Sequence, residues 1–401
     1  MILHIMSTFP PHSETFVMRE IRELRQQGWD MRIGRLRPLQ RTPAAIGFED
    51  LEAIVSKAGW FSRDMLWGLL YFGFLHPRRL FACARLIAPT LDQPVNVLKL
   101  FYILLASLRL AYRFKNAKVT LIRAHFLHSE AVAARFLSIL LQVPYSLTVY
   151  TTFILFPRPI LQAVLKGALF LVADTAQVMQ FLERFQLDRA CIHRIYNSVN
   201  IEDFPLRGPQ TRDRPHLILA VGRLHRKKGY HILLRACALL KGRGLPFGAM
   251  IIGEGPERQR LMQLRHELCL EDRVALLGKL SFEEIRPWYY RAALFAMPSV
   301  VTSEGDSDGL PTVVIEAMAS GLPVIGTRTG AITEAVLDGK TGFIVPADDP
   351  EQLAEQMQRL LEDADLRIQF GAEGRRLAEC KFDLRRKVEL LSNLFRKYCP
   401  K

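Results

Sequence analysis

Cysteine is scarce in this chain of 401 residues, and its six copies are scattered along it. None of them forms the C-x-x-C spacing of zinc sites and redox motifs, and no paired spacing of a disulfide framework is visible. The cysteine content therefore argues against a zinc-binding protein and against a disulfide scaffold. It favours a reducing, cytoplasmic setting.

Long hydrophobic runs are also missing. The longest uncharged apolar stretches are well short of the ~20 residues that a membrane-spanning helix needs. The chain opens on the apolar residues Ile2 to Met6 and continues with Pro10 and Pro11. This opening lacks the basic segment and the long apolar core of a signal peptide. We therefore expect neither a membrane span nor export.

Acidic residues are too few to balance the basic ones. The chain has 54 Lys and Arg residues against 40 Asp and Glu residues, a net charge of +14. Residues 1–200 carry 24 basic and 13 acidic side chains, a net of +11, which leaves +3 for the rest. The first half therefore faces an anionic partner. Charge alone does not distinguish a membrane surface, a nucleic acid and a polyphosphate.

What the sequence does contain is an alternation of apolar runs and helical patterns, in a chain that is 49% hydrophobic and long enough for two domains. This alternation predicts an α/β protein with two doubly wound, Rossmann-like domains. We expect an N-terminal domain at 1–205, a C-terminal domain at 213–375 and a C-terminal helix in 376–401, with a linker rich in proline and glycine between the domains. Strands are predicted at Ile2–Met6, Met31–Leu36, Val119–His125, Tyr145–Tyr150, Ala168–Ala173, Ile192–Tyr196 and Leu294–Met297.

Residues 51–118 depart from this alternation and form helical segments rich in aromatic residues and arginine. Such segments are typical of amphipathic helices that lie on a membrane surface. They are equally typical of helices that pack onto the core of their own domain, and the pattern does not choose between the two. The residues that a membrane surface would use are Trp60, Phe61, Trp67, Tyr71 and Phe72, with Arg63, Arg78 and Arg79.

The stretch 298–330 has the most specific pattern in the chain. It follows a predicted buried strand and begins with a polar loop that ends at Gly309. Pro311 then stands at a natural first helical position, and Gly321 ends the predicted helix. The helix therefore begins at the carboxyl end of a strand, which is where open α/β sheets bind ligands.

This helix start is suited to an anionic, sugar-bearing ligand. The free N–H groups of Thr312 and Val313 would face an anion with the helix dipole behind them. Asp308 lies just before the helix and Glu316 lies on its first turns, so two carboxylates flank one phosphate-sized space. A carboxylate accepts hydrogen bonds from sugar or ribose hydroxyls.

The run D-G-L-P-T-V-V-I-E-A-M-A-S-G-L-P-V-I resembles the signature of the family 4 glycosyltransferases, which are retaining enzymes of GT-B fold. The resemblance implies that Asp308 contacts the donor sugar and that Glu316 contacts the ribose of the nucleotide. Asp308 stands where the family usually has glutamate, so its carboxylate reaches one methylene less far. The further substrate-binding residues implied here are Leu310, Pro311, Thr312 and Val313.

A second element of the predicted site lies in L-I-L-A-V-G-R-L-H-R-K-K-G-Y, a strand, a glycine turn at Gly222 and a basic loop. Arg223 and Lys228 would converge on a diphosphate, the arginine as a planar fork and the lysine as a mobile charge. The segment resembles the family's G-R-x-x-x-K-K-G motif, whose arginine and lysine hold the donor phosphates. A later turn with Gly253 and Gly255 would let the backbone approach the nucleotide, and an ordinary turn is the alternative.

The first domain contributes weaker candidates. Its S-E-T-F opening is similar to that of the exopolysaccharide, colanic-acid-type branch of the family, which makes Ser13 a helix cap that could also touch substrate. His125 stands in R-A-H-F, where the family commonly has H-A-H-F, and a core histidine is the alternative. Tyr150 stands where the family's T-A-H-A-x-D segment places a histidine near the donor sugar, with Phe153 in place of the acid. A tyrosine cannot carry positive charge as imidazole does.

Asp306 and Asp308 also spell D-x-D, which marks a metal site in glycosyltransferases of another fold. Short carboxylate pairs are frequent by chance, and no third oxygen-rich cluster stands nearby in the sequence. We therefore expect no metal and no cofactor. Arg223, Lys228 and the helix start at Thr312 would stabilise the leaving diphosphate in place of a metal.

Together, these patterns predict a glycosyltransferase that moves a sugar from a nucleotide-diphosphate sugar to an acceptor. The resemblance implies retention of configuration, two domains facing one cleft and a last helix that crosses back to the first domain. The basic first half and its aromatic helices favour a polyprenyl-phosphate-linked saccharide as acceptor and an anionic membrane surface as partner. We expect the protein to be peripheral at the inner face of the plasma membrane, in exopolysaccharide assembly.

Two other functions stay open from the sequence. A catalytically weakened, nucleotide-sugar-binding partner subunit is suggested by the joint departure of Asp308, Tyr150 and Phe153 from the family pattern. A nucleic-acid-binding protein is suggested by charge alone, but no nucleic-acid motif is present, and we expect no nucleic acid partner. The donor base, the sugar, the acceptor and the linkage are not readable from the residues.

Overall fold

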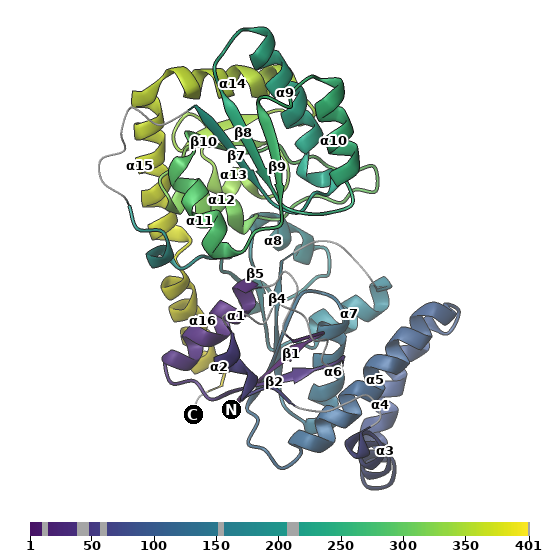
Figure 1. The fold of residues 1–401 in the computed structure, drawn as a ribbon. Helices are drawn as coiled ribbons and strands as arrows, with labels where there is room; N and C mark the ends of the chain where they lie inside the picture. Colours follow the sequence, from purple (N-terminus) through teal and green to yellow (C-terminus); the bar gives the residue numbers. More distant parts are fainter. Residues whose placement is uncertain (10–14, 38–47, 57–61, 151–155, 207–215, 400–401) are drawn as a thin grey trace. The chain divides into compact units, whose positions relative to one another are not determined.

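The structure is a computed structural model that describes residues 1–9, 15–37, 48–56, 62–150, 156–206 and 216–399. The chain divides into two compact units, each with its own parallel sheet (Figure 1). Unit 1 consists of Met1–Ile195 and Lys387–Lys401, and unit 2 consists of Tyr196–Arg386.

Unit 1 contains a six-stranded parallel sheet in the order β2-β1-β3-β4-β5-β6. Nearly all of its strand residues are buried, as expected for a parallel sheet that helices cover on both faces. The strand order reverses between β1 and β3, which pair directly, so the carboxyl ends of these two strands lie side by side. The strands are β1 (Ile2–Met6), β2 (Met31–Arg35), β3 (Leu121–His125), β4 (Tyr145–Val149), β5 (Phe170–Ala173) and β6 (Ile192–Arg194).

The helices of unit 1 include the last helix of the chain. That helix begins in unit 2, and from Lys387 on it belongs to unit 1. Within unit 1, its Ser392 hydroxyl accepts a hydrogen bond of 3.0 Å from the indole Nε1 of Trp29. The described helices are α1 (Thr15–Gln26), α2 (Glu49–Glu52), α3 (Arg63–Leu75), α4 (Pro77–Ile87), α5 (Pro94–Phe114), α6 (Ser129–Leu141), α7 (Arg158–Lys166), α8 (Ala176–Glu183) and α16 (Leu384–Tyr398).

The region 51–118, predicted to be helical, forms α3, α4 and α5, which lie together in unit 1 (Figure 1). Helix α5 is long and apolar enough to cross a membrane by length and composition, but half of its most apolar window is buried within the protein. Phe72 is buried and Tyr71 is partly buried, whereas the Trp67 side chain is 53% exposed. The interpretation as helices that pack onto the core of their own domain therefore holds for Phe72 and in part for Tyr71, and Trp67 lies outside that core. Trp60 and Phe61 lie outside the described residues.

Unit 2 also contains a six-stranded parallel sheet, in the order β12-β11-β10-β7-β8-β9. Here the strand order reverses between β7 and β10, which pair directly. The carboxyl ends of β7 and β10 therefore define the switch point of this unit. The strands are β7 (Leu217–Val221), β8 (Gly248–Ile252), β9 (Val274–Gly278), β10 (Leu294–Met297), β11 (Val324–Thr327) and β12 (Gly342–Val345).

The chain ends in two helices, and the last helix, expected at Phe382–Tyr398, begins at Leu384. Residues up to Lys381 belong to α15, and the chain breaks at Phe382 before α16 begins. Phe382 is fully buried against Tyr196, with the two ring centroids 5.3 Å apart, and this packing interrupts the helix. The helices of unit 2 are α9 (Tyr230–Gly242), α10 (Arg258–Glu267), α11 (Phe282–Arg291), α12 (Thr312–Ala319), α13 (Ile332–Ala335), α14 (Pro350–Glu362) and α15 (Ala364–Lys381).

The predicted fold class is confirmed: each unit is a Rossmann-like domain with a parallel sheet and helices. The helix predicted from Pro311 begins one residue later, because Pro311 is the extended residue that precedes its first turn. Since proline has no N–H, its place at the helix start costs no hydrogen bond. The predicted strands lie within one or two residues of β1 to β6 and β10.

Candidate functional site

The predicted phosphate-binding and sugar-binding residues meet at the switch point of unit 2. Lys228 follows β7, in a short 3-10 turn, and Asp308 follows β10. The Lys228 Nζ atom lies 3.0 Å from Asp308 Oδ2, and both side chains are mostly buried. The same Asp308 oxygen accepts a hydrogen bond of 2.7 Å from the Ser299 hydroxyl. Asp308, the first of the two predicted acidic residues, and Lys228, the predicted phosphate-binding lysine, are therefore neighbours, although 80 positions separate them in the sequence.

A second lysine and a second aspartate pair in the same place. The Lys227 Nζ atom lies 3.1 and 3.0 Å from the two carboxylate oxygens of Asp306. The loop that carries Asp306 is closed on itself, because Thr302 exchanges backbone and side-chain hydrogen bonds with it. The D-x-D carboxylates are thus both paired with lysines, and neither is directed at the other as a joint metal ligand set.

No group of three or more His, Cys, Asp or Glu side chains that could hold a metal ion is present among the described residues.

The Arg223 guanidinium is exposed and forms no ion pair with another described residue. It is therefore free to bind an anion as a planar fork. Lys228 could bind the same anion, but its positive charge would then be divided between the anion and the Asp308 carboxylate.

The three predicted glycines serve the packing of the loops as well as any ligand. A Cβ atom on Gly253, which has a φ of +150°, would lie 1.9 Å from the Gly222 carbonyl oxygen. A Cβ on Gly255 would lie 2.4 Å from the Leu224 carbonyl oxygen. These glycines let the loops after β7 and β8 touch, and the Leu224 N–H donates to the Glu254 carbonyl at 2.8 Å.

Gly222 makes room for a side chain that the sequence did not single out. A Cβ atom on Gly222 would lie 2.8 Å from the Tyr230 hydroxyl. Tyr230 is the first residue of α9, and its buried hydroxyl has no hydrogen-bond partner among the described residues. Burial, together with the nearby Asp308 carboxylate, raises the pKa of this phenol, so it stays protonated and able to donate.

The start of α12 presents the backbone donors that were predicted. The N–H of Val314 bonds to the Pro311 carbonyl at 3.1 Å, and the N–H groups of Thr312 and Val313 precede it on the first turn. The Leu310 side chain is 5% exposed and belongs to the core of unit 2, so only its backbone remains for a ligand.

The second acidic residue is held by a tyrosine from another helix. Glu316 is 9% exposed, and its Oε2 accepts a hydrogen bond of 2.8 Å from the Tyr289 hydroxyl. Tyr289 lies on α11 and is fully buried. A charged acceptor with one fixed donor keeps a defined orientation, which suits recognition of a ribose diol.

Other residues that sequence reasoning missed hold the Asp308 loop in place. A Cβ atom on Gly330, which has a φ of +53°, would lie 1.9 Å from the Asp308 carbonyl oxygen, so only glycine fits there. Thr327 and Thr329 both donate hydrogen bonds to the Ser299 carbonyl. No local motif marks these residues, and only the turn glycine after β11 could have been suspected.

The first-domain candidates His125 and Tyr150 lie in a buried cluster at the sheet of unit 1. The Tyr150 hydroxyl lies 3.3 Å from His125 Nδ1, and the two rings stack. His125 also stacks on His4 and lies 3.8 Å from the Glu20 carboxylate. Glu20 is fully buried and forms ion pairs of 3.2 Å with Arg123 and 2.9 Å with Lys387 of α16, a contact that no local pattern predicts.

The electrostatics of this cluster keep its histidines neutral. Burial, followed by the Arg123 guanidinium, lowers the pKa of His4 to about 3. Burial lowers the pKa of His125 well below its usual value, and burial raises the pKa of Tyr150 well above its usual value. Burial alone would raise the pKa of Glu20, but Lys387 and Arg123 outweigh it and hold that pKa low.

His125 also lines a pocket of about 250 Å³ at the carboxyl ends of β1 and β3, the switch point of unit 1. Glu130 of α6 lines it too, and its Oε1 accepts a hydrogen bond of 3.1 Å from the Ser7 N–H. Burial raises the pKa of the Glu130 carboxyl. Ser13, a predicted substrate-binding residue, and Phe153, which stands in place of the family's acid, lie outside the described residues.

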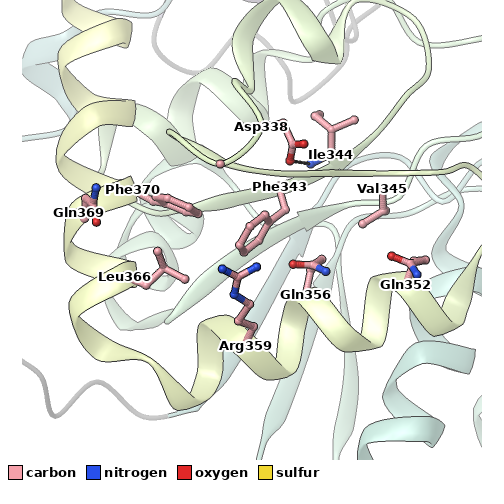
Figure 2. Close-up of a pocket in the computed structure, with 11 residues that line it drawn as sticks. Asp338, Phe343, Ile344, Val345, Gln352, Gln356, Arg359, Leu366, Gln369 and Phe370 are labelled. Atoms are coloured by element: carbon pink, nitrogen blue, oxygen red, sulfur yellow. Dashed lines mark hydrogen bonds between the residues drawn. The ribbon is translucent and has the colours of Figure 1, made fainter.

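A larger pocket, of about 530 Å³, lies between β12, α14 and α15 of unit 2 (Figure 2). The Arg359 guanidinium lies over the Phe343 ring there, 4.9 Å from its centroid, and Gln352 and Gln356 face the strand from α14. None of the predicted site residues lines this pocket. We place the candidate site at the switch point instead, because that is where charged groups of both loops converge.

Residues 206–377 match the family model described as Glycosyl transferases group 1. The match covers less than half of the chain, lies within unit 2 and includes the whole candidate site around Lys228, Asp308 and Glu316. Residues 206–377 are therefore similar to a glycosyltransferase group 1 domain.

The curated relatives align with part of the chain. The putative colanic acid biosynthesis glycosyltransferase WcaL of Escherichia coli strain K12 is 38% identical over 153 residues, which are 38% of this chain and 37% of WcaL. The amylovoran biosynthesis glycosyltransferase AmsK of Erwinia amylovora is 36% identical over 166 residues, 41% of each chain. The aligned parts thus span about two-fifths of the length of these relatives.

Solved structures match over nearly the full length. HepE of Anabaena in complex with UDP gives a TM-score of 0.75 at 17% identity and covers 99% of both chains. A glycosyltransferase from Rickettsia africae gives a TM-score of 0.74 at 18% identity, over 100% of this chain and 98% of the other. These similarities show that the chain has the GT-B fold of those glycosyltransferases, with two Rossmann-like domains.

Proposed function

We propose that this chain is a glycosyltransferase that moves a sugar from a nucleotide-diphosphate sugar to a saccharide acceptor in exopolysaccharide synthesis. The observation that carries the proposal is the meeting of Lys228, Asp308 and the start of α12 at one switch point, within the part of the chain that matches the glycosyltransferase group 1 model. The nucleotide donor is supported by HepE, which was crystallised with UDP.

The geometry accounts for departure of the diphosphate. Negative charge develops on the diphosphate as its bond to the sugar breaks, and Lys228, Arg223 and the N–H groups of Thr312 and Val313 would stabilise that charge. Preorganised donors of this kind need no reorganisation during the reaction. Glu316 would hold the ribose, and Asp308 would accept a hydrogen bond from a sugar hydroxyl. The family resemblance supports retention of the anomeric configuration.

The acceptor in this proposal is a polyprenyl-phosphate-linked saccharide. The relatives WcaL and AmsK are named for colanic acid and amylovoran biosynthesis, which supports a role in exopolysaccharide assembly. A lipid-linked acceptor requires the enzyme to work at a membrane. We therefore place the protein at the cytoplasmic face of the plasma membrane as a peripheral protein, in line with its net charge of +14.

A second function is supported by two contacts. Tyr150 is buried against His125, and the Asp308 carboxylate is already bound by Lys228 and Ser299. A chain whose sugar-binding carboxylate stays engaged in this way would bind nucleotide sugars without transferring the sugar. It would then act as a partner subunit of an active enzyme.

Asp308 variants separate these two functions. Asp308→Asn keeps the shape of the side chain but loses the charge that pairs with Lys228, and we expect sugar transfer to fall by roughly 100-fold. Asp308→Glu keeps the charge, moves the carboxylate by about 1.5 Å, and should leave the fold intact while it shifts the preferred donor. The measurement is the initial rate of transfer and of donor hydrolysis across a panel of nucleotide sugars.

Donor binding is measured separately by thermal shift. A nucleotide sugar at 100 times its dissociation constant adds about 2.7 kcal/mol to the stability of the folded chain. Stabilisation without turnover of any donor would favour the partner subunit. Wild-type transfer rates in Asp308→Asn would show that this carboxylate serves only its contacts with Lys228 and Ser299 and not the donor sugar.

A further inference from the structure

Helix α3 is apolar on nearly all sides, yet only its Gly68 and Phe72 are buried. A helix that is hydrophobic all round is normally buried in a core or in a membrane. The outer faces of α4, α5 and the turn between them also carry exposed apolar side chains. The exposed large hydrophobic residues of these elements are Leu66, Trp67, Leu69, Leu70, Phe74, Leu75, Phe81, Leu91, Val95, Leu98 and Phe101.

These eleven side chains form a cluster rather than a scatter. They lie within 36 consecutive residues, whereas the other large hydrophobics that are exposed among the described residues number six and lie far apart along the chain. Isolated exposed hydrophobics are normal on soluble proteins, but contiguous ones mark an interaction surface. We call the exposed apolar faces of α3, α4 and α5 the apolar face of unit 1.

The apolar face is held outward by tight packing behind it. A Cβ atom on Gly68 would lie 2.6 Å from the Leu108 carbonyl oxygen, so the glycine lets α3 approach the backbone of α5 closely. Asp64 at the start of α3 lies 3.5 Å from Arg113 of α5 and fixes the same orientation. Gly68 and Phe72 are the buried residues of this helix, and its outer side is exposed among the described residues of unit 1.

The helices that carry the apolar face are also rich in positive charge. Residues 62–118 contain nine Lys and Arg side chains and two acidic ones, a net charge of +7. One of the two acids, Asp64, is neutralised by Arg113. The exposed basic residues next to the apolar side chains are Arg63, Arg78, Arg85 and Lys99.

We propose that the apolar face of unit 1 docks onto the surface of an anionic lipid bilayer, with α3 lying in the plane of the interface. Apolar and aromatic side chains such as Trp67 enter the boundary between headgroups and acyl chains, and the arginines pair with anionic headgroups. This docking mode rests on the proposed function, since a lipid-linked acceptor is reached from the same membrane.

Length and burial favour this arrangement over a membrane span. At 1.5 Å per residue, α3 with its 13 residues is about 20 Å long, which is shorter than the ~30 Å hydrocarbon layer. Helix α5 is long enough, but its buried side chains, among them Leu104, Leu108 and Leu110, belong to the core of unit 1. Removing α5 from that core would expose the face of the sheet that it covers.

The test uses the full chain with phosphatidylcholine vesicles that contain or lack phosphatidylglycerol. The variant Trp67→Ser with Phe74→Ser removes two exposed aromatic side chains of α3 and leaves its buried residues intact. The matched control is Met262→Ser with Leu390→Ser, which removes two isolated exposed side chains elsewhere. A charge variant, Arg78→Gln with Arg85→Gln, tests the contribution of the exposed basic residues.

We expect the wild type and the control pair to sediment with the anionic vesicles. The Trp67 and Phe74 pair should bind at least about tenfold less, and the arginine pair should lose binding that salt also removes. Equal binding of all variants, or equal binding to neutral and anionic vesicles, would overturn the proposal. So would self-association of the wild type in the absence of vesicles that the Trp67 and Phe74 pair abolishes, because a second copy would then cover the apolar face.

Donor turnover, measured without vesicles and with a soluble acceptor, separates this proposal from the proposed function. A chain that turns over nucleotide sugars but does not bind vesicles disproves the docking surface and leaves the transferase. A chain that binds vesicles but turns over no donor disproves the transferase and leaves the docking surface. The Trp67 and Phe74 pair should keep its soluble turnover within about twofold of the wild type, since these residues lie in unit 1 and outside the candidate site.

Discussion

The two switch points of this protein share a topology and differ in chemistry. In unit 2, the loops after β7 and β10 bring lysines and aspartates together near the surface, with Lys228 12% and Asp306 28% exposed. In unit 1, the charged side chains next to β1 and β3 lie inside the protein, and Glu20 and Arg123 are fully buried. The same strand order thus supports a ligand site in one unit and an internal ion-pair cluster in the other.

The difference follows from what covers each group of charges. Glu20 carries one negative charge against the positive charges of Arg123 and Lys387, and burial keeps His4 and His125 neutral. The side chains of Glu20 and Arg123 are fully buried and that of Lys387 is nearly so, and their ion pairs join α1, the sheet and α16. In unit 2, an anion can compete with Asp308 for Lys228, because the lysine side chain is 12% exposed.

The largest effect is expected from breaking the buried cluster. Glu20→Ala leaves Arg123 and Lys387 without their carboxylate, and removing one partner of a buried ion pair costs about 3 to 5 kcal/mol of stability. Glu23→Ala on the same helix should change stability by less than about 0.5 kcal/mol. Urea titrations of both variants measure this difference. Equal losses of unfolding free energy would show that the buried ion pairs of Glu20 stabilise the fold no more than the Glu23 side chain does.

The next effect concerns catalysis in unit 2. Lys228→Ala should lower kcat/KM for the donor roughly 10- to 150-fold, the equivalent of the 1.5 to 3 kcal/mol of a charged hydrogen bond. Lys227→Ala is the matched control, because it removes a neighbouring lysine that binds Asp306 instead of Asp308. Initial rates decide between them. If both variants lose the same activity, the loss reflects the reduced positive charge of the site and not a specific contact of Lys228.

The buried histidines should make unit 1 sensitive to mild acid. The unfolded chain protonates His4 near pH 6.5, whereas the folded chain resists until about pH 3. The unfolded state therefore binds more protons in this range, and stability falls as the pH drops. Between pH 7 and pH 5, the loss from His4 is about 2 kcal/mol, and His125 acts in the same direction.

His4→Phe checks this assignment. The variant keeps a ring against His125 but removes one titrating group, so the stability difference between pH 7 and pH 5 should shrink by about 2 kcal/mol. Urea titrations at the two pH values, followed by circular dichroism, provide the measurement. An unchanged difference would mean that His4 does not titrate on unfolding in this range.

The smallest effect is expected at the edge of the candidate site. Tyr289→Phe removes the hydroxyl that donates to Glu316, and a hydrogen bond of this kind contributes about 0.5 to 1.5 kcal/mol. Nucleotide affinity should therefore fall about 2- to 12-fold, with kcat nearly unchanged. Tyr290→Phe, next to it on α11, serves as the control. Titration calorimetry with the nucleotide would contradict the role of Tyr289 if both variants bind alike.

The sequence by itself determined the strands and the elements of the candidate site. Apolar runs such as Leu294–Met297 form strands because a parallel sheet buries both faces, and Pro311 with Gly321 bounds a helix through backbone geometry alone. The pairing of Lys228 with Asp308 was predictable in outline, because loops after neighbouring parallel strands share one edge of the sheet. These signals depend on residues that are close in the sequence, so they can be read without knowing how distant segments pack.

Only the tertiary structure decided which side chains are buried and what they touch. The ion pair of Glu20 with Lys387 joins the two ends of the chain, and the bond of Tyr289 to Glu316 joins two helices whose spacing no motif fixes. The aromatic region 51–118 shows the same limit, since Phe72 faces α5 and Trp67 faces outward. Helical periodicity places residues on faces, but which face meets the core depends on how distant segments pack.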